Sequence, residues 1–227
     1  MDVICISLSG SMISGEKGVN VQFIKKLADL FKRYSKRYKF IVTVGGGYSN
    51  RLYITSTRSI ITNNSVLDQI GIAFTRINAL VLKDLFSELE VYPNVVTTME
   101  ELKQAVSTNG VVVMGGLIPG ISTDAVSALA CEAMNGKMLI NASGISYVYD
   151  RPPEQEGAKK LERLTHAQLL ELAYKYDSRI AKSSFIFDLF ACKIAQRANI
   201  EIRFVSDSIE DLESALQGKD HNGSTVK

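Results

Sequence analysis

Apolar residues along this chain follow two patterns that alternate from end to end. Continuous apolar runs, which predict buried strands, cover residues 3–8, 40–44, 111–116, 137–144 and 200–206. Apolar residues at helical spacing, which predict amphipathic helices, cover residues 21–34, 66–86, 123–134, 164–176, 187–198 and 209–218. Because strands and helices alternate, the pattern predicts an α/β fold with a mostly parallel sheet covered on both faces.

Composition limits the kinds of partner and compartment to expect, and it leaves the predicted fold unchanged. A length of 227 residues suits one α/β domain or two lobes that share a sheet, and the net charge of +2 gives no reason to expect a nucleic-acid or membrane-surface partner. The N-terminus is strand-like rather than a signal peptide, and no apolar run reaches the length of about 20 residues that a membrane helix needs. Cys5, Cys131 and Cys192 are scattered through apolar segments, which predicts buried free thiols in a cytoplasmic protein and no protein metal site.

Glycine-rich turns follow three of the predicted strands. They cover residues 7–11, 43–47 and 113–116, and the second contains three consecutive glycines. In open α/β sheets, ligands bind beyond the carboxyl ends of the strands, where glycine lets backbone N–H groups approach an anion. We therefore predict a phosphate-handling site, with three ordinary tight turns as the alternative. The P-loop motif and the dinucleotide fingerprint are both absent.

Charged residues near these turns suggest phosphoryl transfer more than nucleophilic catalysis by a side chain. Arg51 follows the triple glycine by one helical turn, and Asp124 and Asp188 each open a predicted helix. His166 and His221 form no recognisable catalytic constellation with a serine or cysteine. Phosphoryl transfer requires none, because positioning and charge neutralisation supply most of the catalysis.

The order of these motifs resembles the amino-acid kinase superfamily, and within it the archaeal-type uridylate (UMP) kinases. The resemblance covers nearly the whole chain, and its most specific parts are IGIAFTRINA at 70–79 and GGLIPGISTDAVSALACE at 115–132. It implies a three-layer αβα sandwich and a single domain over 1–227, with an acceptor (UMP) lobe at about 1–135 and a donor (ATP) lobe at about 136–227. The implied enzyme transfers the γ-phosphoryl group of ATP to UMP with Mg²⁺, as a cytoplasmic homohexamer.

The resemblance also assigns site residues. The residues implied for UMP are Gly45, Gly46, Gly47, Arg51, Asp68 and Thr123. Those implied for catalysis are Asp124, Gly10, Ser11 and Asp188. Those implied for ATP are Gly10, Ser11, Asn141, Gly144, Tyr149 and Asp150.

Two departures from the family pattern keep other functions open. Ser7 stands where many members have a lysine, with Lys182 as a candidate substitute. Ser143 and Ser146 stand where aspartate and tyrosine are usual in the donor segment, and Tyr149 and Asp150 follow a short insertion. The alternatives are a superfamily kinase with another acceptor and a non-catalytic nucleotide- or oxyanion-binding oligomer.

Overall fold

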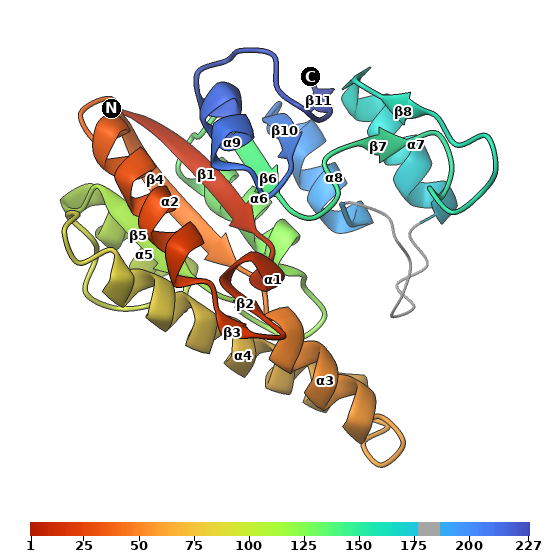
Figure 1. Ribbon diagram of the computed structural model, residues 1–227, viewed down its shortest axis with the longest axis horizontal. Helices are drawn as coiled ribbons and strands as arrows, with labels where there is room; N and C mark the ends of the chain where they lie inside the picture. Colours follow the sequence, from red (N-terminus) through yellow and green to blue (C-terminus); the bar gives the residue numbers. More distant parts are fainter. Residues whose placement is uncertain (177–186) are drawn as a thin grey trace.

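The computed structural model describes residues 1–176 and 187–227, in which a seven-stranded sheet forms the centre (Figure 1). The strand order is β5-β4-β1-β6-β10-β11-β9. The strands are β1 (Asp2–Leu8), β4 (Tyr38–Val44), β5 (Val111–Met114), β6 (Met138–Ala142), β9 (Arg163–Leu164), β10 (Glu201–Val205) and β11 (Thr225–Val226). All neighbouring pairs are parallel except β10 and β11, which confirms the predicted mostly parallel sheet.

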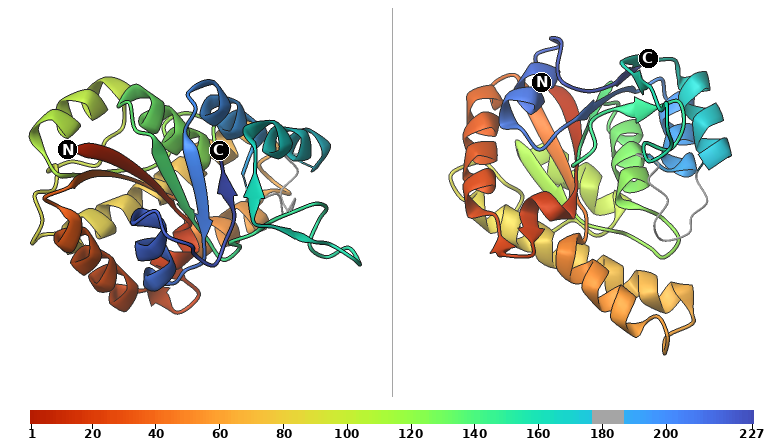
Figure 2. Two further views of the ribbon diagram at one scale, coloured as in Figure 1. Left: turned by 90° about the horizontal axis from the view of Figure 1, so that it is seen from above. Right: turned by 45° about the vertical axis from the view of Figure 1, so that its right-hand side comes forward.

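Helices cover both faces of this sheet, which completes the predicted three-layer sandwich (Figure 2). One layer contains α5 (Met99–Thr108), α6 (Thr123–Ala133), α7 (His166–Tyr176) and α8 (Leu189–Arg197). The other contains α1 (Gly10–Ile13), α2 (Val21–Tyr34), α4 (Asn64–Leu85) and α9 (Ile209–Leu216). Successive residues of β1 alternate between the two layers: Ile4 and Ile6 face the α2 side, and Cys5 faces the α6 side.

The remaining elements lie at the margins of the sandwich. The hairpin of β2 (Ser14–Gly15) and β3 (Gly18–Val19) follows α1, and the hairpin of β7 (Val148–Tyr149) and β8 (Lys160–Leu161) follows β6. Helix α3 (Gly47–Thr57) packs against α4, and the two helices project together beyond the rest of the molecule (Figures 1 and 2).

Capping hydrogen bonds mark the starts of α7 and α5. Thr165 caps the start of α7, because its hydroxyl accepts the backbone N–H of Gln168 at 3.2 Å. Helix α5 is absent from the predictions, since its apolar stripe is short. Its start nevertheless carries a variant of the capping box, in which Thr98 accepts the N–H of Glu101 and the Glu101 carboxylate accepts the N–H of Thr97, the residue before the N-cap.

Candidate active site

The first two glycine turns lie against each other at the carboxyl ends of β1 and β4. A side chain at position 10 would place its Cβ 2.2 Å from the Gly47 nitrogen and 2.3 Å from the Gly45 oxygen, so only glycine fits there. Gly47 also has φ +74°, a left-handed conformation that favours glycine. Close contact between the two backbones therefore requires these glycines.

A recess of about 280 Å³ opens over these turns. It brings together most of the residues predicted from the glycine motifs: Gly10, Ser11, Gly45, Gly46, Gly47, Arg51, Thr123, Asp124 and Asn141. Among the described residues that line it, Arg51 is the only basic side chain. Residues from both predicted lobes thus meet in one small polar space, next to the N-terminal ends of α3 and α6.

Asp124 is held in this recess by two neutral donors from neighbouring strands. Ser7 on β1 and Asn141 on β6 are register partners and lie on the face of the sheet that α6 covers. The Ser7 hydroxyl and the Asn141 amide each donate to Oδ1 of Asp124 at 2.7 Å. The position where the family often has a lysine is therefore occupied by a hydrogen-bond donor to the carboxylate.

The surroundings of Asp124 change its acidity. Removal from water raises its pKa to about 6, the neighbouring charge of Asp188 acts in the same direction, and the hydrogen bonds from Ser7 and Asn141 oppose the rise. A neutral donor pair stabilises the carboxylate less than a cation does. The pKa of Asp124 therefore lies well above that of an ordinary aspartate.

A second recess of about 350 Å³ adjoins the first, and the two share Gly46, Asn50 and Thr123. Its apolar lining comes from Ile54, Leu67, Ile72, Ile118 and Ile121. Two charged residues, Asp68 and Arg58, also line it. Asp68 accepts the backbone N–H of Gly120 at 2.8 Å and so ties α4 to the loop before α6. The two recesses together offer a polar part and a larger, more apolar part.

Asp188 lies beside the first recess but does not line it. One carboxylate oxygen caps α8 by accepting the N–H groups of Phe190 and Ala191, at 2.9 and 3.0 Å. The other oxygen accepts a short hydrogen bond from Ser122, which is itself the N-cap of α6. Asp188 therefore joins the starts of two helices, and its predicted catalytic role stays a prediction.

The residues predicted to bind ATP, the phosphoryl donor, do not all lie in the same place. Asn141 lies in the first recess, but Gly144, Tyr149 and Asp150 line neither recess. Asp150 accepts the N–H of Lys159 within the β7–β8 hairpin, and its pKa is lowered by that hydrogen bond. Lys182, the candidate substitute for the missing lysine, lies outside the described residues. The predicted ATP contacts of Gly144, Tyr149 and Asp150 stay predictions.

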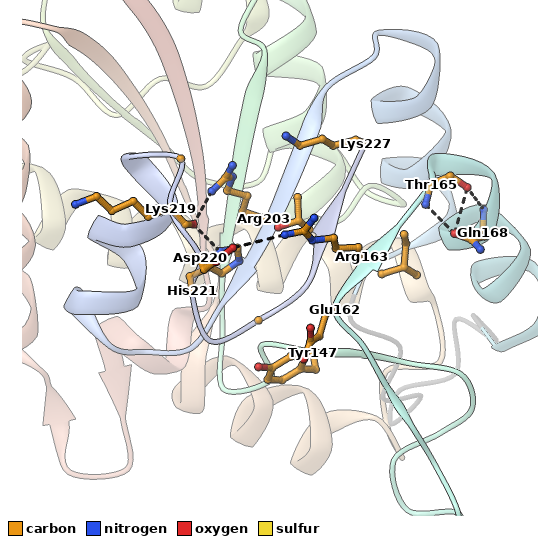
Figure 3. Close-up of a pocket in the computed structure, with 14 residues that line it drawn as sticks. Tyr147, Glu162, Arg163, Thr165, Gln168, Arg203, Lys219, Asp220, His221 and Lys227 are labelled. Atoms are coloured by element: carbon orange, nitrogen blue, oxygen red, sulfur yellow. Dashed lines mark hydrogen bonds and ion pairs between the residues drawn. The ribbon is translucent and has the colours of Figure 1, made fainter.

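A larger recess, about 730 Å³, lies elsewhere, over β9, β10 and β11 (Figure 3). It contains several basic residues, and three of them form ion pairs. Arg203 pairs with Glu201 at 2.6 Å, Lys227 pairs with the same carboxylate at 3.0 Å, and Arg163 lies 3.7 Å from Asp220. Because Arg203 and Lys227 share one carboxylate and Lys219 also lines the recess, these ion pairs offset its positive charge only in part.

Four polar residues of the site are missing from the sequence predictions. Ser7 is named there only as a departure, and Asn50, Thr75 and Asn78 are not named at all. Asn50 lines both recesses, and its side-chain oxygen has no hydrogen-bond partner within the part of the chain that the structure describes. For Thr75 and Asn78, the sequence did contain a signal: they are two polar residues on the buried face of α4.

Comparisons with known proteins agree with this geometry. Residues 2–206 match the model of the amino acid kinase family. A uridylate kinase of Thermoplasma acidophilum is 36% identical over 95% of this chain and 92% of the relative, and one of Methanocaldococcus jannaschii is 32% identical over 95% of each. The crystal structure of uridylate kinase from Archaeoglobus fulgidus has a TM-score of 0.85 and 30% identity, with both chains fully covered.

Proposed function

The chain belongs to the amino acid kinase family and its uridylate kinase branch, and from that premise we propose that it transfers the γ-phosphoryl group of ATP to UMP, giving UDP. The observation that carries the proposal is the pair of adjoining recesses, one polar and glycine-walled, the other larger and partly apolar. A nucleoside monophosphate has the same two parts.

In this proposal, UMP occupies both recesses. Its phosphate lies against Gly45, Gly46 and Gly47, where backbone N–H groups and the Arg51 guanidinium neutralise its charge. Its nucleoside end extends toward Asp68, with Thr123 at the boundary that the two recesses share. A phosphate oxygen of UMP is the nucleophile, so no side chain needs to attack phosphorus.

The transferring group passes between this phosphate and the first glycine turn. Gly10 and Ser11 stand next to the Gly45–Gly47 turn and supply the donor side of the recess. Asp124, fixed by Ser7 and Asn141, orders the polar groups around the transferring phosphoryl group. The ATP nucleoside end lies toward β7, where Gly144, Tyr149 and Asp150 are its proposed contacts.

The described residues fit a Mg²⁺ ion that arrives with ATP. They contain no group of three or more His, Cys, Asp or Glu side chains placed to hold a metal by themselves. Mg²⁺ commonly uses one or two carboxylates together with substrate phosphates, and Asp124 is the carboxylate positioned for that role. When bound, the ion would neutralise charge on the phosphates.

We also propose a cytoplasmic homohexamer. The projecting α3–α4 pair, together with the turn that joins the two helices, exposes the apolar side chains Leu52, Tyr53, Ile60, Val66, Ile77 and Leu80. By length and composition α4 could also cross a membrane, but its polar residues hold loops of the sheet, which favours contact with another copy. Cys5 and Cys131 are free thiols, and all three cysteines are buried, which suits a reducing compartment.

A coupled assay of nucleoside diphosphate formation tests the function. The purified protein, with ATP and Mg²⁺, is given UMP, CMP, AMP, GMP or isopentenyl phosphate, and we expect turnover with UMP. Turnover with another acceptor alone would overturn the substrate. Binding of UMP in calorimetry without turnover would support a binding protein whose donor segment is altered.

A further inference from the structure

We propose that Thr75, Arg76 and Asn78 of α4 are positioning residues that set the spacing of two glycine turns and thereby the affinity for the acceptor nucleotide. The inference rests on the proposed function, because it assigns these turns to UMP. Its basis is a set of hydrogen bonds from one helix to two loops that follow different strands.

Asn78 holds the turn after β4. Its side chain is 7% exposed, and its amide nitrogen donates to the Gly45 carbonyl at 2.8 Å. Gly45 is the first of the three glycines assigned to the UMP phosphate. Since a buried carbonyl without a partner is costly, this bond fixes where the turn leaves the strand.

Thr75 holds the turn after β5. Its hydroxyl accepts the backbone N–H of Gly116 at 2.7 Å and donates to the Ile72 carbonyl, so both its capacities are used. A Cβ on Gly115 would lie 2.7 Å from this hydroxyl oxygen. The turn therefore packs directly against α4.

Arg76 fixes the next part of the same loop. Its guanidinium donates from Nε to the Gly116 carbonyl at 3.2 Å and from Nη2 to the Leu117 carbonyl at 3.3 Å. The loop then passes Ile118, which lines the second recess, and reaches Thr123. Its course therefore determines the wall on the nucleoside side.

Because one helix binds both turns, their separation is set by the spacing of Thr75 and Asn78 along α4. These residues are three positions apart and share the buried face of the helix. The two turns border the recesses assigned to UMP, so a change in their separation weakens UMP binding. None of the three residues needs to contact the reacting atoms for this effect.

The matched pair Thr75→Val and Thr75→Ser tests the proposal, because valine keeps the shape and serine keeps the hydroxyl. We expect the valine variant to raise KM for UMP about tenfold while KM for ATP changes less than about twofold. The serine variant should restore most of the affinity. Asn78→Leu should behave like Thr75→Val, and Gln69→Ala, at an exposed position of the same helix, should match the wild type.

Calorimetry with UMP and a thermal unfolding curve accompany each variant. Equal KM values for UMP in the valine and serine variants, or equal shifts in both KM values, would overturn the inference and leave the proposed function intact. A wild-type protein that neither binds nor phosphorylates UMP would remove the proposed function and this inference together.

Discussion

At the scale of single residues, the site depends on a carboxylate held by two neutral donors. The pKa of Asp124 is about 6 in the folded chain against 3.8 in an exposed aspartate, mainly because the group is removed from water. The folded state therefore binds this proton more tightly, and the free energy of unfolding decreases as pH rises from about 4 to about 6.

Asp124→Asn should separate stability from activity. At pH 7 the variant should be more stable than the wild type, by at most about 3 kcal/mol, because it carries no buried charge. At pH 4 most of the gain should disappear, since the wild-type carboxyl is then protonated in the folded state and partly protonated in the unfolded state. Ligand-free thermal unfolding at both pH values measures this, and kcat should fall at pH 7. Equal stability of the two proteins at pH 7 would contradict the raised pKa of Asp124.

Arg51→Ala should weaken UMP binding more than ATP binding. The residue is the basic side chain of the first recess among the described residues, and losing a charge-assisted contact to phosphate should raise KM for UMP by about tenfold or more. Arg163→Ala removes the same charge from an exposed arginine in the recess of Figure 3 and serves as the control. Similar KM values in the two variants would argue against the proposed phosphate contact.

At the scale of elements, two substitutions of Asp188 can distinguish a structural role of this residue from a catalytic one. Asp188→Ala removes the cap of α8 and the bond to Ser122, which should cost about 1–2 kcal/mol of stability. Asp188→Asn keeps a capping oxygen and loses the charge. If kcat falls in the asparagine variant while its melting temperature is retained, the charge acts in catalysis, and unchanged kcat leaves only the capping role.

The elements themselves were largely predictable. The spacing of apolar residues located α2 and α4 to within a few residues, because long periodic segments carry a strong signal. Strands of two residues, such as β7 and β11, are too short to show any period. The pairing of Ser7 with Asn141 was also hidden, since it depends on which strands are neighbours and on their register, and neither is a local property.

At the scale of the whole molecule, parallel strands explain why the glycine turns could be predicted to meet. All carboxyl ends of parallel strands reach one edge, so turns far apart in sequence become neighbours. The division into lobes near residue 135 stays a prediction. The donor residues were assigned by resemblance across an altered segment, and no periodic pattern fixes their distance from the recess.

The projecting α3–α4 pair leads to a prediction about assembly. Ile77→Glu and Leu80→Glu place charges on its exposed apolar surface and should shift the protein to smaller assemblies in light scattering after gel filtration. Tyr174→Glu, at an exposed position of α7, should leave the mass of the assembly unchanged. An unchanged mass in all three variants would exclude this surface as the interface.

The glycine turns also determine which positions tolerate mutation. A library at position 10 should recover glycine alone, because any Cβ there meets the backbone of the next turn. Among the described residues, no atom lies within 4 Å of a Cβ added at position 144, so Gly144→Ala should fold with the melting temperature of the wild type. If that variant also has an increased KM for ATP, the bound nucleotide, and not the fold, is what selects glycine at this position. An unchanged KM would place the nucleotide away from residue 144.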